Sequence, residues 1–530
     1  MVRPLSSRPG SALIVVAVAM ALFLLPFWGL LTGTQPESLF NALAADTYYY
    51  AAMARNFSAH GFFGVDGETV SNGYMPLWQM IVAGLDLLFA GPGTAPTVLL
   101  TAVFLASAML TATGMALIVL FAIQRTGAGR TLLLLPLLVP GASFFALEHA
   151  YRKVQAIGLH SGFGTWSQAN GMESGVGLLC FAAFLWAAAR SLDPGRSTRG
   201  SAAIAGTLAF LVMMGRLDDV FLGIALGVCL LPQAIAEKRP RLIVAMSLVP
   251  LAGTAIYIWI NINTAGTPLP TSGTSKTELF GFPTSWDIVR QIGRDQIFDG
   301  RLLPLFSALV IGGAGLLSQR GKPLNHAKAA LVRMLSLYLI LKAGFLFSSV
   351  PILKQGYWYY TNMLATMNLL IFFAIARAVP RAMPGSALAL GTTVTLAIAL
   401  LAGANAQDQL SRYRDEDYTI AARDMCIDSD RLDSLLPDDA KIVDTGDGVY
   451  AFCLARPAIT VTGLADSRAF RTRALEIGLF AAALEKGHDI VVESPVRWAS
   501  YDWRSLLGDG HRAILLGEDP VFRVWRVEAK

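Results

Sequence analysis

Long apolar stretches separated by short polar segments fill the first 405 residues of the 530-residue chain. An α-helix needs roughly 20 apolar residues to cross about 30 Å of hydrocarbon, with shorter or tilted exceptions. By this criterion we predict eleven membrane spans, at residues 12–31, 96–123, 131–147, 174–189, 202–214, 220–235, 242–260, 302–317, 334–350, 358–376 and 387–404. The first span lacks a small-residue cleavage site, so we expect it to be retained. The pattern predicts a polytopic α-helical membrane protein.

The pattern changes after residue 405. Short β-type runs occur at residues 441–444, 458–462 and 489–493, a helical pattern occupies 467–486, and two further strands are expected at 512–516 and 521–527. We therefore predict two domains. Residues 1–405 form a transmembrane domain whose long first loop, 32–95, carries surface helices, and residues 406–530 form a small α/β domain.

One further apolar run, at residues 75–90, is either a span or a helix lying on the outer surface. If it lies on the surface, the short inner segments carry 16 Lys and Arg and the longer outer loops carry nine. Counting it as a span reverses this balance and violates the positive-inside rule. Asp86 within the run agrees, since a lipid-facing carboxylate is costly. We therefore expect an inner N-terminus and an extracytoplasmic C-terminal domain.

Composition and charge exclude a large soluble enzyme, because 54% of the residues are hydrophobic and only 15% are charged. Lys and Arg outnumber Asp and Glu by 26 to 15 up to residue 405, whereas the remainder has 16 against 22. The net positive charge therefore comes from membrane-flanking loops, and we expect the lipid bilayer rather than nucleic acid as a partner. Because the long loops, 32–96, 148–173 and 261–301, all lie on the outer side, we expect any chemistry there.

The first outer loop carries the most specific string, AADTYYYAAMARNFSAHGFFGVDGETVSNGYMPLWQ. Asp46 precedes an amphipathic stretch in which Tyr49, Met53 and Asn56 share a helical face. Asp46 either caps this helix or faces a substrate. The D-x-YYY…AR-N…HGF…NGY-PLW pattern resembles the first extracytoplasmic loop of GT-C superfamily glycosyltransferases, multispanning enzymes that take sugars from polyprenyl-phosphate carriers.

Later stretches fit the same resemblance in the same order. They are NGMESGVGLL at Glu173, MMGRLDD at Arg216 with Leu217 in place of the usual proline, GTPLPTSGTSK ending at Lys276, WYYT at 358–361, and ITVTGLADS at 459–467. The plan of eleven spans and a C-terminal cap is similar to that of actinobacterial arabinofuranosyltransferases. Many relatives have two consecutive acids before the tyrosines, whereas Ala45 precedes Asp46 here, so we do not expect a two-carboxylate metal site.

The resemblance implies an inverting transfer with Asp46 as the general base. A polyprenyl-phosphate sugar already has a good leaving group, so the reaction needs a base on the acceptor hydroxyl and cations near the departing phosphate. Lys276 and Arg216 are the predicted donor-phosphate ligands. Alternatively, Lys276 is simply solvated, and Arg216 forms a structural salt bridge with Asp218 or Asp219.

A set of polar and aromatic side chains near the outer interface is predicted to bind substrate. Its members are Tyr48, Tyr49, Asn72, Tyr74, Trp78, Glu173, Ser272, Tyr359 and Tyr360. The alternative for the aromatic members is an interfacial belt, which membrane proteins of any function have. Lys342, in the middle of a span, either faces an internal cavity or pairs with Asp86.

No cofactor is implied. The histidines are scattered, and no Cys or His spacing resembles a metal site. A requirement for a divalent cation stays open, although no residues indicate one. Cys180 and Cys229 fall in spans and are interpreted as small apolar residues. Cys426 and Cys453 both lie in the outer domain, where a disulfide is permitted; the sequence leaves that pairing open.

The favoured hypothesis is a hexosyl- or pentosyltransferase, such as a mannosyl- or arabinosyltransferase of the cell envelope. It would move a sugar from a polyprenyl-phosphate carrier to a glycan, lipid or protein acceptor at the outer face of a bacterial cytoplasmic membrane. One alternative is a glycolipid transporter or flippase. The other is a non-catalytic scaffold derived from the GT-C fold, which Ala45 favours.

Overall fold

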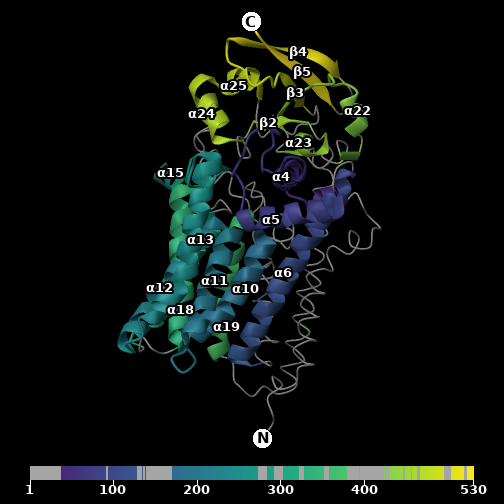
Figure 1. Cartoon of the computed structure of the whole chain (residues 1–530). Coiled ribbons are helices and arrows are strands. Elements are labelled where there is room, and N and C mark those ends of the chain that lie inside the picture. Colours follow the sequence, from purple (N-terminus) through teal and green to yellow (C-terminus); the bar gives the residue numbers. More distant parts are fainter. Residues whose placement is uncertain are drawn as a thin grey trace.

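The computed structural model describes residues 38–90, 94–127, 170–272, 283–291, 302–321, 327–350 and 357–378, the isolated positions 134, 138 and 393, and, with short gaps, 423–530. Within these residues a bundle of long helices is joined at one end by a five-stranded sheet with short helices (Figure 1). The sheet lies beyond the bundle end that carries α4, Thr47–His60.

Six segments of the described residues are long and apolar enough to cross a membrane. They are α6 (Pro96–Thr126), α10 (Ser174–Ser191), η6 with α12 (Leu217–Ala236), α13 (Arg241–Ala265), α18 (Ala327–Ser349) and the 3-10 turn η8 with α19 (Trp358–Arg377). The shorter helices α11 (Arg199–Gly215) and α17 (Leu302–Leu317) occupy two more predicted spans. The predicted polytopic helical fold is confirmed. The predicted spans at 12–31, 131–147 and 387–404, and the predicted domain boundary at 405, lie outside the described residues apart from isolated positions.

Glycines set the distance between α6 and α10. A Cβ on Gly114 would lie 2.9 Å from the backbone nitrogen of Leu179, and one on Gly175 would lie 2.5 Å from the carbonyl oxygen of Ser107. Small residues allow helix backbones to approach closely inside a membrane, where packing rather than hydrophobicity drives association. The Ser107 hydroxyl also donates to the Met172 carbonyl at 3.3 Å. The start of α10 is therefore held tightly against α6.

Between α11 and α12 the chain breaks its helical course at Arg216. Arg216 has extended dihedrals, φ −150° and ψ 111°, and the 3-10 turn η6 (Leu217–Asp219) follows before α12 (Val220–Ala236) begins. A Cβ on Gly215 would lie 3.3 Å from the Cα of Gly177 in α10. This contact directs Arg216 toward the start of α10.

The apolar run at residues 75–90 forms α5 (Pro76–Leu85) and the π-helix η3 (Asp86–Ala90), which lie across the end of the bundle (Figure 1). Asp86 is buried and accepts a hydrogen bond from the hydroxyl of Ser58 in α4. Leu87, Leu88 and Phe89 are exposed by 60%, 76% and 60%. One side of the run thus anchors α4, while the other presents apolar side chains outward.

The C-terminal α/β unit contains β1 (Ile442–Asp444), β2 (Ala458–Thr460), β3 (Ile490–Glu493), β4 (His511–Glu518) and β5 (Arg523–Ala529) in the order β2-β1-β3-β5-β4. β1 pairs in parallel with β2 and β3, whereas β5 is antiparallel to β3 and β4. The predicted helix at 467–486 is two helices, α24 (Arg468–Ile477) and α25 (Leu479–Glu485), because Gly478 between them has a φ of 93°. The remaining short helices are α3 (Ser38–Ala42), α15 (Ser285–Arg290), α22 (Ser429–Asp433), α23 (Val449–Cys453) and η9 (Trp503–Leu506).

The C-terminal unit packs onto the first loop through α23. The Arg55 guanidinium of α4 lies 4.4 Å from the centre of the Phe452 ring and donates to the Phe452 carbonyl at 3.2 Å. Gly448, at the start of α23, lies so close to Tyr49 that a Cβ there would approach the Tyr49 ring to 2.6 Å. A disulfide between Cys426 and Cys453 fixes the other end of α23, with 4.9 Å between their Cα atoms. The pairing that the sequence left open is therefore formed.

Candidate active site

A small cavity lies between the first half of α4, the segment just before α5, the start of α10, Ser272 and the turn η8 (Tyr357–Tyr360). Its volume is about 40 Å³. The residues around it come from five separate stretches of the chain. Among the described residues they are Asp46, Tyr49, Tyr50, Met53, Gly73, Tyr74, Met75, Met172, Glu173, Ser272, Trp358 and Tyr359.

Asp46 lies at this cavity and does not cap its helix. Although it directly precedes α4, its side chain makes no capping hydrogen bond, and the capping interpretation is wrong. It is half-buried, and no hydrogen-bond or ion-pair partner of its carboxylate occurs among the residues that the structure describes. Residues Tyr49, Tyr50 and Met53 follow it at i+3, i+4 and i+7, so they share its helical face. An uncommitted carboxylate therefore faces the cavity.

Backbone contacts bring Asp46 close to Glu173. The Ala44 amide donates to the Asn170 carbonyl at 2.9 Å, and the Thr47 hydroxyl donates to the same oxygen at 3.0 Å. Gly171, with a φ of 81°, packs directly against Thr47. The segment before α4 is thus joined to the segment before α10, and their carboxylates are close enough to repel one another.

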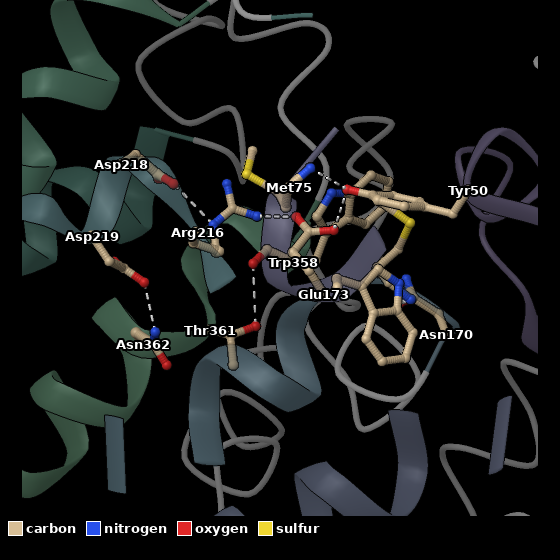
Figure 2. A network of polar contacts seen from close by, with 12 residues as sticks. Tyr50, Met75, Asn170, Glu173, Arg216, Asp218, Asp219, Trp358, Thr361 and Asn362 are labelled. Carbon is tan, nitrogen blue, oxygen red and sulfur yellow. Dashed lines mark hydrogen bonds and ion pairs between the residues drawn. The ribbon is translucent and has the colours of Figure 1, made fainter. Parts of the chain in front are cut away.

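Glu173 differs from Asp46 because both of its carboxylate oxygens accept hydrogen bonds. One carboxylate oxygen accepts from Arg216 Nη1 at 2.5 Å, and the other accepts from the Tyr50 hydroxyl at 3.3 Å (Figure 2). Glu173 is 2% exposed and Arg216 is 1% exposed. Burial raises the pKa of Tyr50 well above 10, and the Glu173 carboxylate adds to this, so Tyr50 is a neutral hydrogen-bond donor. Met75 donates its amide to the Tyr50 oxygen at 3.2 Å.

Arg216 continues the polar network into the bundle. Its Nε donates to Asp218 at 3.0 Å, and Lys342 forms ion pairs with Asp218, at 3.3 Å, and with Asp219. Asp219 also accepts from Asn362 at 2.6 Å (Figure 2). The expected Arg216–Asp218 salt bridge is therefore present, whereas the suggested pairing of Lys342 with Asp86 is wrong. These contacts explain how so many charges are buried.

One nitrogen of Arg216 is left over. Its Nη2 is buried and has no hydrogen-bond partner among the described residues. The guanidinium carbon lies 4.3 Å from the centre of the Tyr359 ring, and Tyr359 itself lines the cavity. Arg216 thus stands directly behind the cavity wall, with one donor uncommitted.

The structure gathers some of the predicted substrate residues and separates others. Tyr49, Tyr74, Glu173, Ser272 and Tyr359 line the cavity together with Asp46. Four other predicted residues are buried in the protein interior, with exposed fractions of 0% to 2%, and are not part of the described cavity lining. They are Tyr48, Asn72, Trp78 and Tyr360. Lys276 lies outside the described residues.

The interior contacts explain why those side chains are absent from the cavity. The Trp78 indole donates to the Gly171 carbonyl at 3.0 Å, which anchors α5 to the start of α10. Asn72 donates to the Leu269 carbonyl and accepts from the Thr271 amide. Asn72 therefore holds the segment that carries Ser272 next to the first loop, and acts as a structural residue in this geometry.

Sequence reasoning did not select several lining residues, of which Tyr50 and Trp358 bear polar groups. Tyr50 lies at i+4 from Asp46, so helical spacing alone is the signal that would have identified it. Met172 and Gly73 offered no such signal, because their positions depend on contacts between distant segments. Among the described residues, no group of three or more His, Cys, Asp or Glu side chains is arranged to hold a metal ion.

Comparison with solved structures identifies the fold. Over 97% of both chains, the structure resembles ArnT from Cupriavidus metallidurans in the apo state, with a TM-score of 0.50 and 12% identity. The same protein bound to undecaprenyl phosphate gives 0.49 and 13% over 98% of both chains. The oligosaccharyltransferase of Archaeoglobus fulgidus, tethered to an acceptor peptide, gives 0.46 and 13%, covering 92% of this chain and 69% of that one.

No family model and no curated protein matches the sequence. At 12% identity, the similarity to apo ArnT concerns the arrangement of the helices and the C-terminal unit rather than individual residues. That arrangement agrees with the fold that the sequence motifs predict. The chain therefore has the GT-C fold.

Proposed function

We propose that the protein is an inverting glycosyltransferase that takes its sugar from a polyprenyl-phosphate carrier. The observation that carries this proposal is the uncommitted Asp46 carboxylate in a cavity at the end of a membrane bundle, beside the buried Glu173–Arg216 pair. Two carboxylates in one site take different roles when their surroundings differ. Asp46 has no hydrogen-bonded partner in the described part of the chain and is the base, whereas Glu173 anchors Arg216 and Tyr50.

In the proposed reaction, Asp46 removes the proton of the acceptor hydroxyl as that oxygen attacks the anomeric carbon. The bond between this carbon and the phosphate oxygen breaks on the opposite face, and the carrier leaves as polyprenyl phosphate. Arg216 donates from its free Nη2 to the phosphate. Because Glu173 and Asp218 already neutralise Arg216, net positive charge must come from another residue, and the sequence motif assigns that role to Lys276.

The cavity volume of about 40 Å³ accommodates only a few water molecules. Binding a sugar therefore requires its walls to separate. The walls belong to several segments, including the one that carries Ser272 and the start of α19 at Trp358 and Tyr359. We propose that the hydroxyls of Tyr49, Tyr74, Tyr359 and Ser272 bind the sugar once the walls have moved, and that residues 406–530 form the cap over it.

The test of the base is Asp46→Asn, which keeps the shape of the side chain and removes its basicity. Membranes from a deletion strain that produces the variant are supplied with radiolabelled polyprenyl-phosphate mannose or arabinose, in separate assays. General base catalysis typically contributes about 10²- to 10⁴-fold, so transfer to endogenous acceptors should fall by that factor.

The matched control is Glu68→Gln, a half-exposed carboxylate of the same loop that pairs with Lys441 away from the cavity. It should transfer at the wild-type rate, since exposed ion pairs contribute little. Wild-type transfer by a folded Asp46→Asn protein would refute the base assignment. Carrier translocation without a new glycosidic bond in the wild type would instead support a flippase.

A further inference from the structure

A second and larger cavity lies at the end of the bundle opposite the C-terminal unit. It has a volume of about 570 Å³ and is formed where α6 ends, α18 begins and α19 ends (Figure 1). Its described lining consists of Arg125, Thr126, Lys328, Leu331, Val332, Phe373, Ala376 and Arg377. The volume falls within the range of typical ligand sites, about 300–1,000 Å³.

The polar part of this lining is cationic. Arg125, Lys328 and Arg377 contribute three positive charges from three helices, and the described lining contains no carboxylate. The Arg125 Nε is buried without a hydrogen-bond partner in the described part of the chain, and its guanidinium lies 5.3 Å from the Phe121 ring centre. Asp193 is close enough to act on Arg125 electrostatically, but it also faces Arg196 at 3.9 Å. The cavity therefore favours an anion.

The other part of the lining is apolar. Leu331 and Val332 from α18 face the cavity together with Phe373 and Ala376 from α19. A free phosphate ion would gain nothing from contact with this apolar wall. A lipid, in contrast, has an anionic head group directly joined to apolar chains. The three cations lie within the last or first residues of helices long enough to span a bilayer, which is where head groups are found.

We propose that this cavity binds an anionic glycerophospholipid, with its phosphate among Arg125, Lys328 and Arg377 and an acyl chain along the apolar wall. In the orientation predicted from the charge distribution, the lipid belongs to the cytoplasmic leaflet, which is rich in anionic lipids. The site is separate from the Asp46 cavity, since α6 and α19 span the bundle between the two.

The proposal is tested by native mass spectrometry of the full-length protein in detergent, with dioleoylphosphatidylglycerol or dioleoylphosphatidylcholine added. The wild type should retain phosphatidylglycerol selectively. A cation near an anionic lipid surface contributes roughly fivefold to binding, so Arg125→Gln with Arg377→Gln should weaken retention about 25-fold. If that double variant does not fold, Lys328→Gln, at an exposed position, should weaken retention about fivefold.

The matched control is Arg241→Gln with Arg320→Gln. Both arginines are exposed cations at the same end of the bundle, outside the described cavity lining. This control should retain the lipid as the wild type does. Equal losses in both double variants would overturn the proposal, because binding would then depend only on the general positive charge.

Two competition experiments distinguish a phospholipid from the other phosphate-bearing ligands. Undecaprenyl phosphate and millimolar inorganic phosphate are each added as competitors of phosphatidylglycerol. Failure of inorganic phosphate to displace the lipid supports the role of the apolar wall, and displacement overturns it. Binding of undecaprenyl phosphate but not of phosphatidylglycerol would make the cavity a second carrier site and overturn the phospholipid assignment.

Discussion

Arg216 connects three side chains of the site. It neutralises Glu173 at 2.5 Å and Asp218 at 3.0 Å, and it lies against Tyr359. Removing one partner of a buried ion pair leaves an unpaired charge in a medium that solvates it poorly. Arg216 therefore both stabilises the fold and supports the cavity wall. Substituting Glu173 together with Arg216 distinguishes the effect of the ion pair from the effect of an unpaired carboxylate.

We expect Arg216→Gln to lower the free energy of unfolding by about 3–5 kcal/mol, because Glu173 and Asp218 lose their cation. Glu173→Gln together with Arg216→Gln should recover part of this loss, since both members of the pair become neutral. Unfolding of the purified protein in detergent, followed for both single variants and the double variant, measures the coupling. Strictly additive losses would show that the pair is energetically unimportant.

The predicted helical face of Tyr49, Met53 and Asn56 supplied two residues of the cavity lining, Tyr49 and Met53, and the motif at Glu173 identified the second carboxylate. Trp78 shows where such reasoning stops. An indole ring can stack on a sugar, but the Trp78 indole donates a hydrogen bond to the carbonyl of Gly171, 93 positions away in sequence. A local pattern cannot reveal which distant carbonyl a side chain will reach, so packing and binding roles look the same in the sequence.

At the scale of elements, the junction between the C-terminal unit and the first loop is rich in ionisable groups. Asp466 is 3% exposed and accepts hydrogen bonds from the Thr460 amide and hydroxyl. Its neighbours Asp66 and Lys486 form an ion pair at 3.1 Å that joins the loop to the unit. Burial raises the pKa of Asp466 to about 8, Asp66 adds to this, and Lys486 opposes it.

This raised pKa predicts that acid strengthens the junction. Between the ordinary pKa of 3.8 and about 8, the folded state holds a proton on Asp466 that the unfolded state releases. The free energy of unfolding should therefore fall as pH rises through this window and level off above it. Asp466→Asn should remove that slope, measured as unfolding in detergent from pH 5 to pH 9.

His488 nearby has a pKa lowered by burial and contributes the opposite slope below about pH 6.5. The test is therefore the difference between wild type and Asp466→Asn at each pH, in which the His488 contribution cancels. An identical slope in both proteins would contradict the role of Asp466.

Runs of β-type residues predicted all five strands of the C-terminal unit to within a few residues. The break at Gly478 was not predicted, because a single glycine inside a helical pattern is often tolerated. Nor did the pattern predict the contact between Gly448 and Tyr49, which depends on how two distant units meet. The elements followed from local periodicity, whereas the junction between the C-terminal unit and the first loop did not.

At the scale of the whole molecule, exposed cations gather at one end of the helix bundle. The cations of the second cavity and the exposed Arg241 and Arg320 lie at one end of the bundle, and Asp46 and the sheet lie at the other. The positive-inside rule predicts that the end with the clustered cations faces the cytoplasm.

Site-directed labelling measures this orientation. Gly510→Cys, at an exposed position where an added Cβ meets no neighbouring atom, should react with a membrane-impermeant maleimide in intact spheroplasts. Arg241→Cys should react only after permeabilisation. Cys180 is buried and Cys426 and Cys453 are paired, so replacing the half-buried Cys229 by alanine in both variants keeps the native background low. The reverse labelling pattern would invert the proposed topology and remove Asp46 from the outer face.

The contact of Arg55 with Phe452 joins positions 397 residues apart. During biosynthesis α4 emerges early, whereas α23 emerges only after every described span has been made. The contact between the C-terminal unit and α4 therefore forms last, once Cys453 has been made and can pair with Cys426. A nascent chain halted between its final span and α23 would have every described helix of the membrane bundle but lack the contact of Gly448 with Tyr49, a residue of the cavity lining. The order of synthesis thus delays this support of the cavity lining until the molecule is nearly whole.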